Sequence, residues 1–150
     1  MSDDTASTSN LTKAPNWFVA VAGLALIWNL LGVMAFFAQA MMTPEQFSAL
    51  PLDQQELLKN VPAWANAAFA VAVFGGTLGS VLLLLKKTLA IPMFVLSVCG
   101  VSTQMFYSFA MSNSIEVYGA EAAGMPIMIF SVAVALIFMA RKAKSEGWSS

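Results

Sequence analysis

The sequence predicts an all-α integral membrane protein, a left-handed four-helix bundle with both termini in the cytoplasm. Four stretches without a charged residue, 14–44, 60–85, 88–115 and 122–140, dominate the chain of 150 residues. All seven basic and eight acidic residues lie between or beyond these stretches. Each stretch reaches the roughly 20 apolar residues that a helix needs to cross about 30 Å of hydrocarbon. The basic residues also gather on one side of the expected helices, which indicates the orientation.

The first membrane helix is expected at residues 17–40, after a tail at 1–14 that is rich in Ser, Thr and Asp. This tail has no apolar periodicity, so we expect it to be disordered and cytoplasmic. The segment Ala38-Gln39-Ala40 resembles a signal-peptide cleavage site. However, the apolar run at 17–37 is longer than the roughly 7–15 residues of a signal core, which favours an uncleaved helix.

An outer loop at 41–62 follows, and it is long enough for one or two short helices. Thr43-Pro44-Glu45-Gln46 has the sequence of a capping box with proline at the first helical position. The apolar residues Leu57, Leu58 and Val61 are expected to lie along the membrane interface. A loop that binds a partner protein is the alternative interpretation.

The remaining membrane helices are expected at 63–85, 89–111 and 122–140. Pro62, Pro92 and Pro126 fall just before or within the first turn of these helices, where a missing N–H costs little. Residues 15–144 therefore form a single four-helix domain, and 145–150 form a short cytoplasmic tail.

The charges orient the bundle by the positive-inside rule. One side of the expected helices carries six of the seven basic residues, namely Lys13, Lys86, Lys87, Arg141, Lys142 and Lys144. The other side has only Lys59, among the acidic residues of the loops. Both termini and the turn at 86–87 are therefore predicted to be cytoplasmic.

Small and polar residues recur at three-and-four spacing on every expected helix, which favours a left-handed bundle. The stripes are Ala22, Ala25, Asn29, Gly32, Phe36 and Gln39; Ala68, Ala72, Gly75 and Gly79; Ser97, Gly100, Gln104, Tyr107 and Met111; and Gly124, Met128, Ser131 and Ala135. Small residues let helix backbones approach closely in lipid. Gly32, Gly75, Gly79 and Gly100 are the expected packing positions.

Polar and aromatic side chains in the middle and outer parts of the bundle form the candidate pocket. Its members are Trp28, Asn29, Asn66, Gln104 and Tyr107. Uncharged polar residues in membrane helices often only bond a neighbouring helix. Intramembrane polar clusters are also enriched at functional sites, so a ligand pocket is the second interpretation.

Composition argues against several classes of function. The chain has no His and a single Cys, Cys99, so we expect no metal site and no cofactor. A net charge of −1 gives no reason to expect nucleic-acid binding. Catalysis would have to use the loop carboxylates Glu45, Asp53, Glu56, Glu116 and Glu121, which are more simply solvated charges. We therefore expect no enzyme.

Several segments resemble a group of small bacterial inner-membrane proteins that tend to be labelled uncharacterised or sugar transporter. The segments are Trp28-Asn29-Leu30-Leu31-Gly32, Pro62-Ala63-Trp64, Phe74-Gly75-Gly76-Thr77-Leu78-Gly79, Gln104-Met105-Phe106-Tyr107 and Gly147-Trp148. The layout is also similar to that of DoxX-like four-helix proteins. The resemblance implies a bacterial cytoplasmic membrane and the same fold, and it transfers no catalytic residue.

Two functions follow as hypotheses. The first is an accessory or scaffold subunit that packs against a membrane-protein partner or forms a homo-oligomer within the lipid bilayer. The alternative is a facilitative transporter of small, neutral, sugar-like solutes that acts as a homo-oligomer. Facilitative transport is specified because the four stretches contain no carboxylate that could couple transport to protons or sodium.

Overall fold

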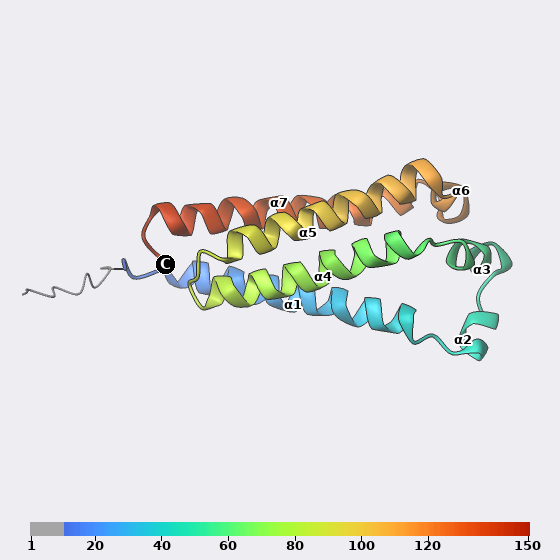
Figure 1. Cartoon of the computed structure of the whole chain (residues 1–150), viewed down its shortest axis with the longest axis horizontal. Helices are drawn as coiled ribbons and strands as arrows, with labels where there is room; N and C mark the ends of the chain where they lie inside the picture. The colour runs from blue at the N-terminus through green and yellow to red at the C-terminus, as the bar shows by residue number, and fades with distance from the viewer. Residues whose placement is uncertain (1–10) are drawn as a thin grey trace, which may run out of the picture.

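The computed structural model describes residues 11–150, and four long helices account for most of this part of the chain (Figure 1). They are α1 (Asn16–Ala40), α4 (Ala63–Leu84), α5 (Ala90–Phe106) and α7 (Gly124–Ser145). A π-helical turn, Tyr107–Met111, extends α5. The prediction of an all-α chain with four helices able to span a membrane is confirmed. The prediction of a disordered tail at 1–14 falls largely on residues 1–10, which lie outside the described residues.

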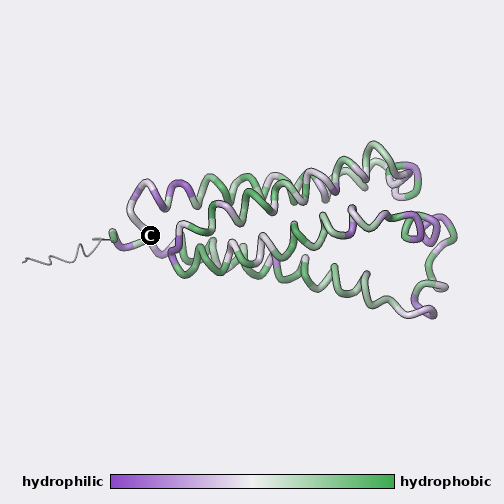
Figure 2. Tube along the Cα trace, in the orientation of Figure 1, coloured by the Kyte–Doolittle hydropathy of each residue, from purple (hydrophilic) through white to green (hydrophobic). Residues whose placement is uncertain are grey.

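The lengths and composition of the long helices suit a bilayer. At 1.5 Å per residue, 22 to 25 residues extend about 33 to 37 Å, slightly more than the hydrocarbon core. Figure 2 shows apolar residues along the middle of the molecule and hydrophilic residues at its two ends. The helices can thus cross the hydrocarbon with their polar connections outside it.

The loops at one end contain short helices. In the first loop these are α2 (Pro44–Ser48) and α3 (Leu52–Lys59), as the sequence predicted. The predicted capping box is confirmed: Gln46 N donates to Thr43 Oγ1 (3.2 Å) and Thr43 N donates to Gln46 Oε1 (3.0 Å). The second loop contains α6 (Ser114–Tyr118) and a 3-10 turn, Ala120–Ala123, which sequence analysis missed.

The long helices pack in chain order. The contact between α4 and α5 is the most extensive, followed by α1 with α4 and α5 with α7. The end of the molecule that carries Lys86, Lys87 and Arg141 is called the basic end below. At this end α1 also meets α7, where Phe18 and Ala22 share one buried cluster with Ala140 and Ala143. Farther along, the two helices are separated by a groove. The fold is therefore a bundle with one side incompletely closed.

The first described residues, the C-terminus and the α4–α5 turn lie together at the basic end (Figure 1). Thr12 N donates to Gly147 O (2.9 Å), and Ser150 N donates to Lys86 O (2.9 Å). The indole of Trp148 packs edge-on against Trp17 and Phe18, with ring centroids 5.8 and 5.5 Å apart. The segment 145–150, predicted as a short cytoplasmic tail, is thus docked onto the bundle.

Helix α7 extends to Ser145, beyond the predicted end at residue 140. The basic residues that mark the edge of the hydrocarbon are good helix formers and interact favourably with a helix C-terminus, so they continue the helix. Gly147 (φ +73°) ends it: Trp148 N donates to Ala143 O (2.8 Å) and Gly147 N to Lys144 O (3.2 Å). This is the Schellman arrangement.

Helix α4 ends in the same arrangement with a lysine in the glycine position. Lys87 N donates to Leu82 O (2.8 Å) and Lys86 N to Leu83 O (3.0 Å). Lys86 has φ 57°, a left-handed conformation that costs a non-glycine residue roughly 1–2 kcal/mol. Its basic side chain is favourable near the helix C-terminus, which offsets part of this strain.

The predicted packing stripe of the last helix is wrong. Gly124, Met128, Ser131 and Ala135 are all exposed, and nothing lies within 4 Å of a Cβ placed on Gly124. The buried face of α7 consists instead of Ala133, Leu136, Ala140 and Ala143. Ser131 satisfies its own hydroxyl by donating to Ile127 O (2.8 Å), so its presence did not require a neighbouring helix.

Candidate functional site

The contact between α4 and α5 is built from glycines. A Cβ on Gly100 would lie 2.7 Å from both Ala68 O and Ala72 N, and one on Gly75 would lie 3.3 Å from Met93 O. A Cβ on Gly79 would lie 2.8 Å from the ring of Phe94. The backbones at Gly100 therefore approach more closely than a side chain would allow, and at Gly75 a Cβ would make an unusually tight contact.

Asn29 lies where α1, α4 and α5 meet. Its Nδ2 donates to Ala25 O (2.8 Å) and to Ser80 Oγ (3.2 Å). A Cβ on Gly76 would overlap the Asn29 amide and lie 3.2 Å from Ser97 Oγ. Ser97 Oγ in turn donates to Ala72 O (2.6 Å). The polar groups in this region thus bond within the chain and join the three helices.

Gly32 belongs to the same face of α1. A Cβ on Gly32 would lie 3.1 Å from Val73 Cγ1. The predicted stripe of α1 is buried or half-buried along its length, whereas Leu30 and Leu31 between its members are exposed. The missing side chain at Gly32 thus admits Val73 of α4.

Asn66 lies near the end of the bundle that carries α2 and α3. The residue is exposed, and its Oδ1 accepts a hydrogen bond from Gln39 Nε2 at 3.5 Å. Both residues line a cavity of about 700 Å³ that the first loop helps to enclose. Phe47 and Lys59 contribute to its wall, and the Lys59 ammonium lies 5.4 Å from the centroid of the Phe47 ring.

Gln104 and Tyr107 lie on α5 and its π-helical extension. Tyr107 is buried, its hydroxyl donates to Asn60 O (3.2 Å), and its ring meets Trp64 edge-on at 5.6 Å. Gln104 Oε1 is buried without a hydrogen-bond partner in the structure. Ser112 N donates to Tyr107 O (2.9 Å) at the end of the π-helical turn, and Met111 of the predicted stripe is exposed.

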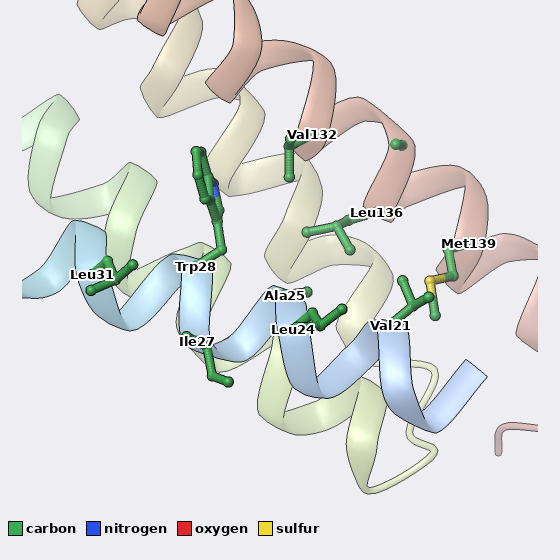
Figure 3. A pocket seen from close by; sticks show the side chains of 10 residues that line it. Val21, Leu24, Ala25, Ile27, Trp28, Leu31, Val132, Leu136 and Met139 are labelled. Carbon is green, nitrogen blue, oxygen red and sulfur yellow. The ribbon is translucent and has the colours of Figure 1, made fainter. Parts of the chain in front are cut away.

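Trp28 lies in a different place, the groove between α1 and α7 (Figure 3). The groove has a volume of about 480 Å³ and an almost wholly apolar lining. Its walls are Val21, Leu24, Ala25, Ile27, Trp28 and Leu31 of α1 and Val132, Ala135, Leu136 and Met139 of α7. In Figure 3 the Trp28 ring stands between the two helices, and Leu136 extends from α7 toward Ala25.

The five predicted pocket residues are thus distributed over separate places. Asn29 is seven residues along the bundle from Gln104, because the Asn29 amide lies beside Gly76 and Ser97. Seven helical residues correspond to about 10 Å. No hydrogen bond within residues 11–150 joins Asn29, Gln104 and Tyr107, which were expected to belong to one candidate pocket.

Sequence analysis missed the groove itself. The one available signal was the small-residue stripe of the last helix, which continues from Ala135 through Met139 to Lys142 at helical spacing. This stripe predicted a packing face, but its residue Ala135 lines the groove instead. A sequence pattern of small residues does not show whether a neighbouring helix arrives.

Within residues 11–150, no group of three or more His, Cys, Asp or Glu side chains is placed to hold a metal ion. Cys99 is exposed on α5 as a free thiol. No protein-family model matches the chain, and comparison with curated proteins and with solved structures finds no similar protein.

Proposed function

We propose that this protein is a non-enzymatic accessory or scaffold subunit of the bacterial cytoplasmic membrane that acts by packing its helices against another membrane protein. The observation that carries the proposal is the contrast between the inside and the outside of the bundle. Most intramembrane polar groups bond within the chain, whereas the flanking helices present long apolar faces. Helix packing is the interaction that such faces offer.

The half of the bundle at the basic end offers a ligand few free hydrogen-bonding groups and little space. The Asn29 amide bonds Ser80, and Ser97 bonds the backbone of α4. Phe94 fills the space beside Gly79 and is itself buried. A solute path through one chain would have to separate helices that are in close contact.

The outer faces are large. Met34 of α1 and Phe138 of α7 are each 66% exposed, although both lie well inside apolar spans. Helices α1 and α7 each pack extensively against only one other long helix. Exposed apolar surface is expected beside lipid, but it is also the surface that a second membrane protein requires.

In the proposed arrangement the helices form a left-handed bundle, and both termini lie in the cytoplasm. Its support is the six-to-one distribution of basic residues between the two ends of the molecule. An alkaline phosphatase domain fused after Ser150 should be inactive, because this enzyme folds only outside the cytoplasm. A fusion within the first loop, after Asn60, should be active, and the reverse result would contradict the orientation.

Facilitative transport of small neutral solutes is the second candidate. It is favoured by the cavity between α1, the first loop and α4, where Gln39, Asn66 and Lys59 offer hydrogen-bonding groups. The unpartnered Gln104 Oε1 is a further acceptor. Because the close contact between α4 and α5 leaves no path through the basic half of the bundle, this function would require a path between chains in a homo-oligomer.

Site-specific photo-crosslinking in native membranes tests the accessory role. A crosslinking amino acid is placed at Met34, Leu78, Phe106 or Phe138, one exposed position on each long helix. A partner should form a discrete, stoichiometric adduct from one face, that is, from one or two neighbouring helices only. Adducts between copies of this chain, together with sugar uptake by reconstituted vesicles, would favour the transporter. The absence of protein adducts from all four positions would contradict the accessory role.

A further inference from the structure

The groove between α1 and α7 is a binding surface that neither proposed function uses. We propose that it holds an acyl chain of an anionic glycerophospholipid, whose phosphate lies beside Lys142 and Trp17 at the basic end. The argument rests on the lining of the groove, on its length and on the charge at its mouth. It depends only on which end of the molecule is basic.

The lining matches a hydrocarbon chain. All ten residues of the walls are apolar or present an apolar side to the groove. Leu24 remains 65% exposed within it, so the protein itself does not cover this surface. Ala25 and Leu136 are buried and form the floor where the two helices come together. A flexible chain can fill such a groove without requiring a hydrogen bond.

The length matches one leaflet of a bilayer. The wall of α1 runs from Val21 to Leu31, and ten helical residues extend about 15 Å. The wall of α7 runs from Val132 to Met139 and is shorter. Half of a hydrocarbon core of about 30 Å is also about 15 Å. A transmembrane helix of a partner would need a groove along the full span, whereas an acyl chain needs only this half.

The mouth of the groove carries a positive charge at the depth of a headgroup. Lys142 lies one turn beyond Met139, and Trp17 lies one turn before Val21, so each continues one wall. The Lys142 ammonium lies 5.7 Å from the centroid of the Trp17 ring, which places the two side chains together. Tryptophan is favoured at the headgroup level, and basic residues beside grooves between membrane helices attract anionic headgroups.

The surroundings favour an anion over a zwitterionic lipid. Among residues 11–150, the basic end carries Lys13, Lys86, Lys87, Arg141, Lys142 and Lys144 against one acidic side chain, Glu146. A basic residue that lies beside the bound headgroup strengthens the binding of an anionic lipid by roughly fivefold in affinity. The apolar groove and this charge together select one molecule, a lipid with an anionic phosphate headgroup.

Trp28 provides a direct probe, because its ring lies in the groove. The full-length protein is reconstituted into phosphatidylcholine vesicles that contain a small fraction of phosphatidylglycerol with brominated acyl chains, which quench tryptophan fluorescence on contact. The Trp28 signal is the difference between the wild type and Trp28→Phe. We expect several-fold stronger quenching than with the same fraction of brominated phosphatidylcholine. Equal quenching by the two lipids would overturn the proposal.

Two pairs of variants separate the groove from general charge. Lys142→Gln should reduce the preference for phosphatidylglycerol about fivefold, whereas Lys87→Gln, an equal loss of charge at the same end, should leave it nearly unchanged. Ala135→Phe should fill the groove and abolish the excess quenching, whereas Ala67→Phe on an exposed face of α4 should not. Equal effects within either pair would overturn the proposal. Soluble glycerol phosphate should not compete, and competition would indicate an anion site without the acyl chain.

Discussion

Replacement of Gly100 by alanine should destabilise the protein although alanine is the better helix former. The added Cβ would lie 2.7 Å from Ala68 O and Ala72 N, which is 0.7 Å less than the 3.4 Å at which ordinary contact begins. Both obstructing atoms belong to the backbone of α4, so no side chain can rotate away. The two helices must therefore move apart along the most extensive contact in the molecule.

The size of this effect follows from two opposing terms. Overpacking of a tight contact costs about 1–3 kcal/mol, and the upper part of that range applies because a radial gap of 0.5–1 Å already loses roughly a quarter to a half of each dispersion contact. The gain in helix propensity from glycine to alanine is up to about 1 kcal/mol. We expect a net loss of about 2 kcal/mol in the free energy of unfolding.

Gly23 on α1 provides the matched control. Nothing lies within 4 Å of a Cβ placed there, so Gly23→Ala should leave the free energy of unfolding unchanged or raise it by up to about 1 kcal/mol. Equilibrium unfolding in mixed detergent micelles, followed by circular dichroism, measures both variants. The close contact between α4 and α5 would be refuted if Gly100→Ala were as stable as the wild type, or if Gly23→Ala lost as much free energy of unfolding as Gly100→Ala.

Three further predictions concern a helix end and the polar groups. Lys86→Gly should be about 1 kcal/mol more stable than Lys86→Ala in the same unfolding assay, because both variants lack the charge and only glycine relieves the strain of the left-handed backbone. Equal stability of the two variants would argue against the left-handed conformation at this position. Asn29→Ala and Ser80→Ala should show a coupling of roughly 0.6 kcal/mol in a double-mutant cycle, and additive effects would mean that their hydrogen bond contributes nothing. Gln104→Leu should leave the melting temperature unchanged or raise it, because Gln104 Oε1 has no hydrogen bond to lose. Tyr107→Phe should lower the melting temperature, because it removes the hydrogen bond to Asn60 O. A large loss of stability in Gln104→Leu would indicate that Gln104 has a hydrogen-bond partner.

Much of the secondary structure could be predicted from the sequence. Helix lengths in a bilayer are set by the thickness of the hydrocarbon and by the obligation to satisfy every backbone polar group, and both leave direct traces in the distribution of charged residues. The start of α4 after Pro62 and the capping box at Thr43 were predicted correctly, because these ends depend on local chemistry. The end of α7 was not, because the basic cluster marks the edge of the membrane and the helix continues to Ser145.

The faces that meet could be predicted only where the residues themselves restrict the partner. Gly75 and Gly100 lie at contacts, as the three-and-four spacing suggested. Ser131 and Ala135 have the same spacing on α7, yet they lie on its uncovered face. A small residue permits close approach but does not create it, since in lipid there is little hydrophobic drive to bring two helices together.

The tertiary structure alone decided where the polar and basic groups lie relative to one another. Asn29 and Gln104 share the expected inward direction, but their depths differ by about seven helical residues, or 10 Å. The groove between α1 and α7 and the approach of Lys142 to Trp17 join residues from opposite ends of the chain. Such neighbours depend on helix order, offset and splay, which arise from many weak contacts summed over the whole bundle. The hydrophobicity of each residue shows which segments cross the membrane, whereas these distances arise only when the helices are assembled.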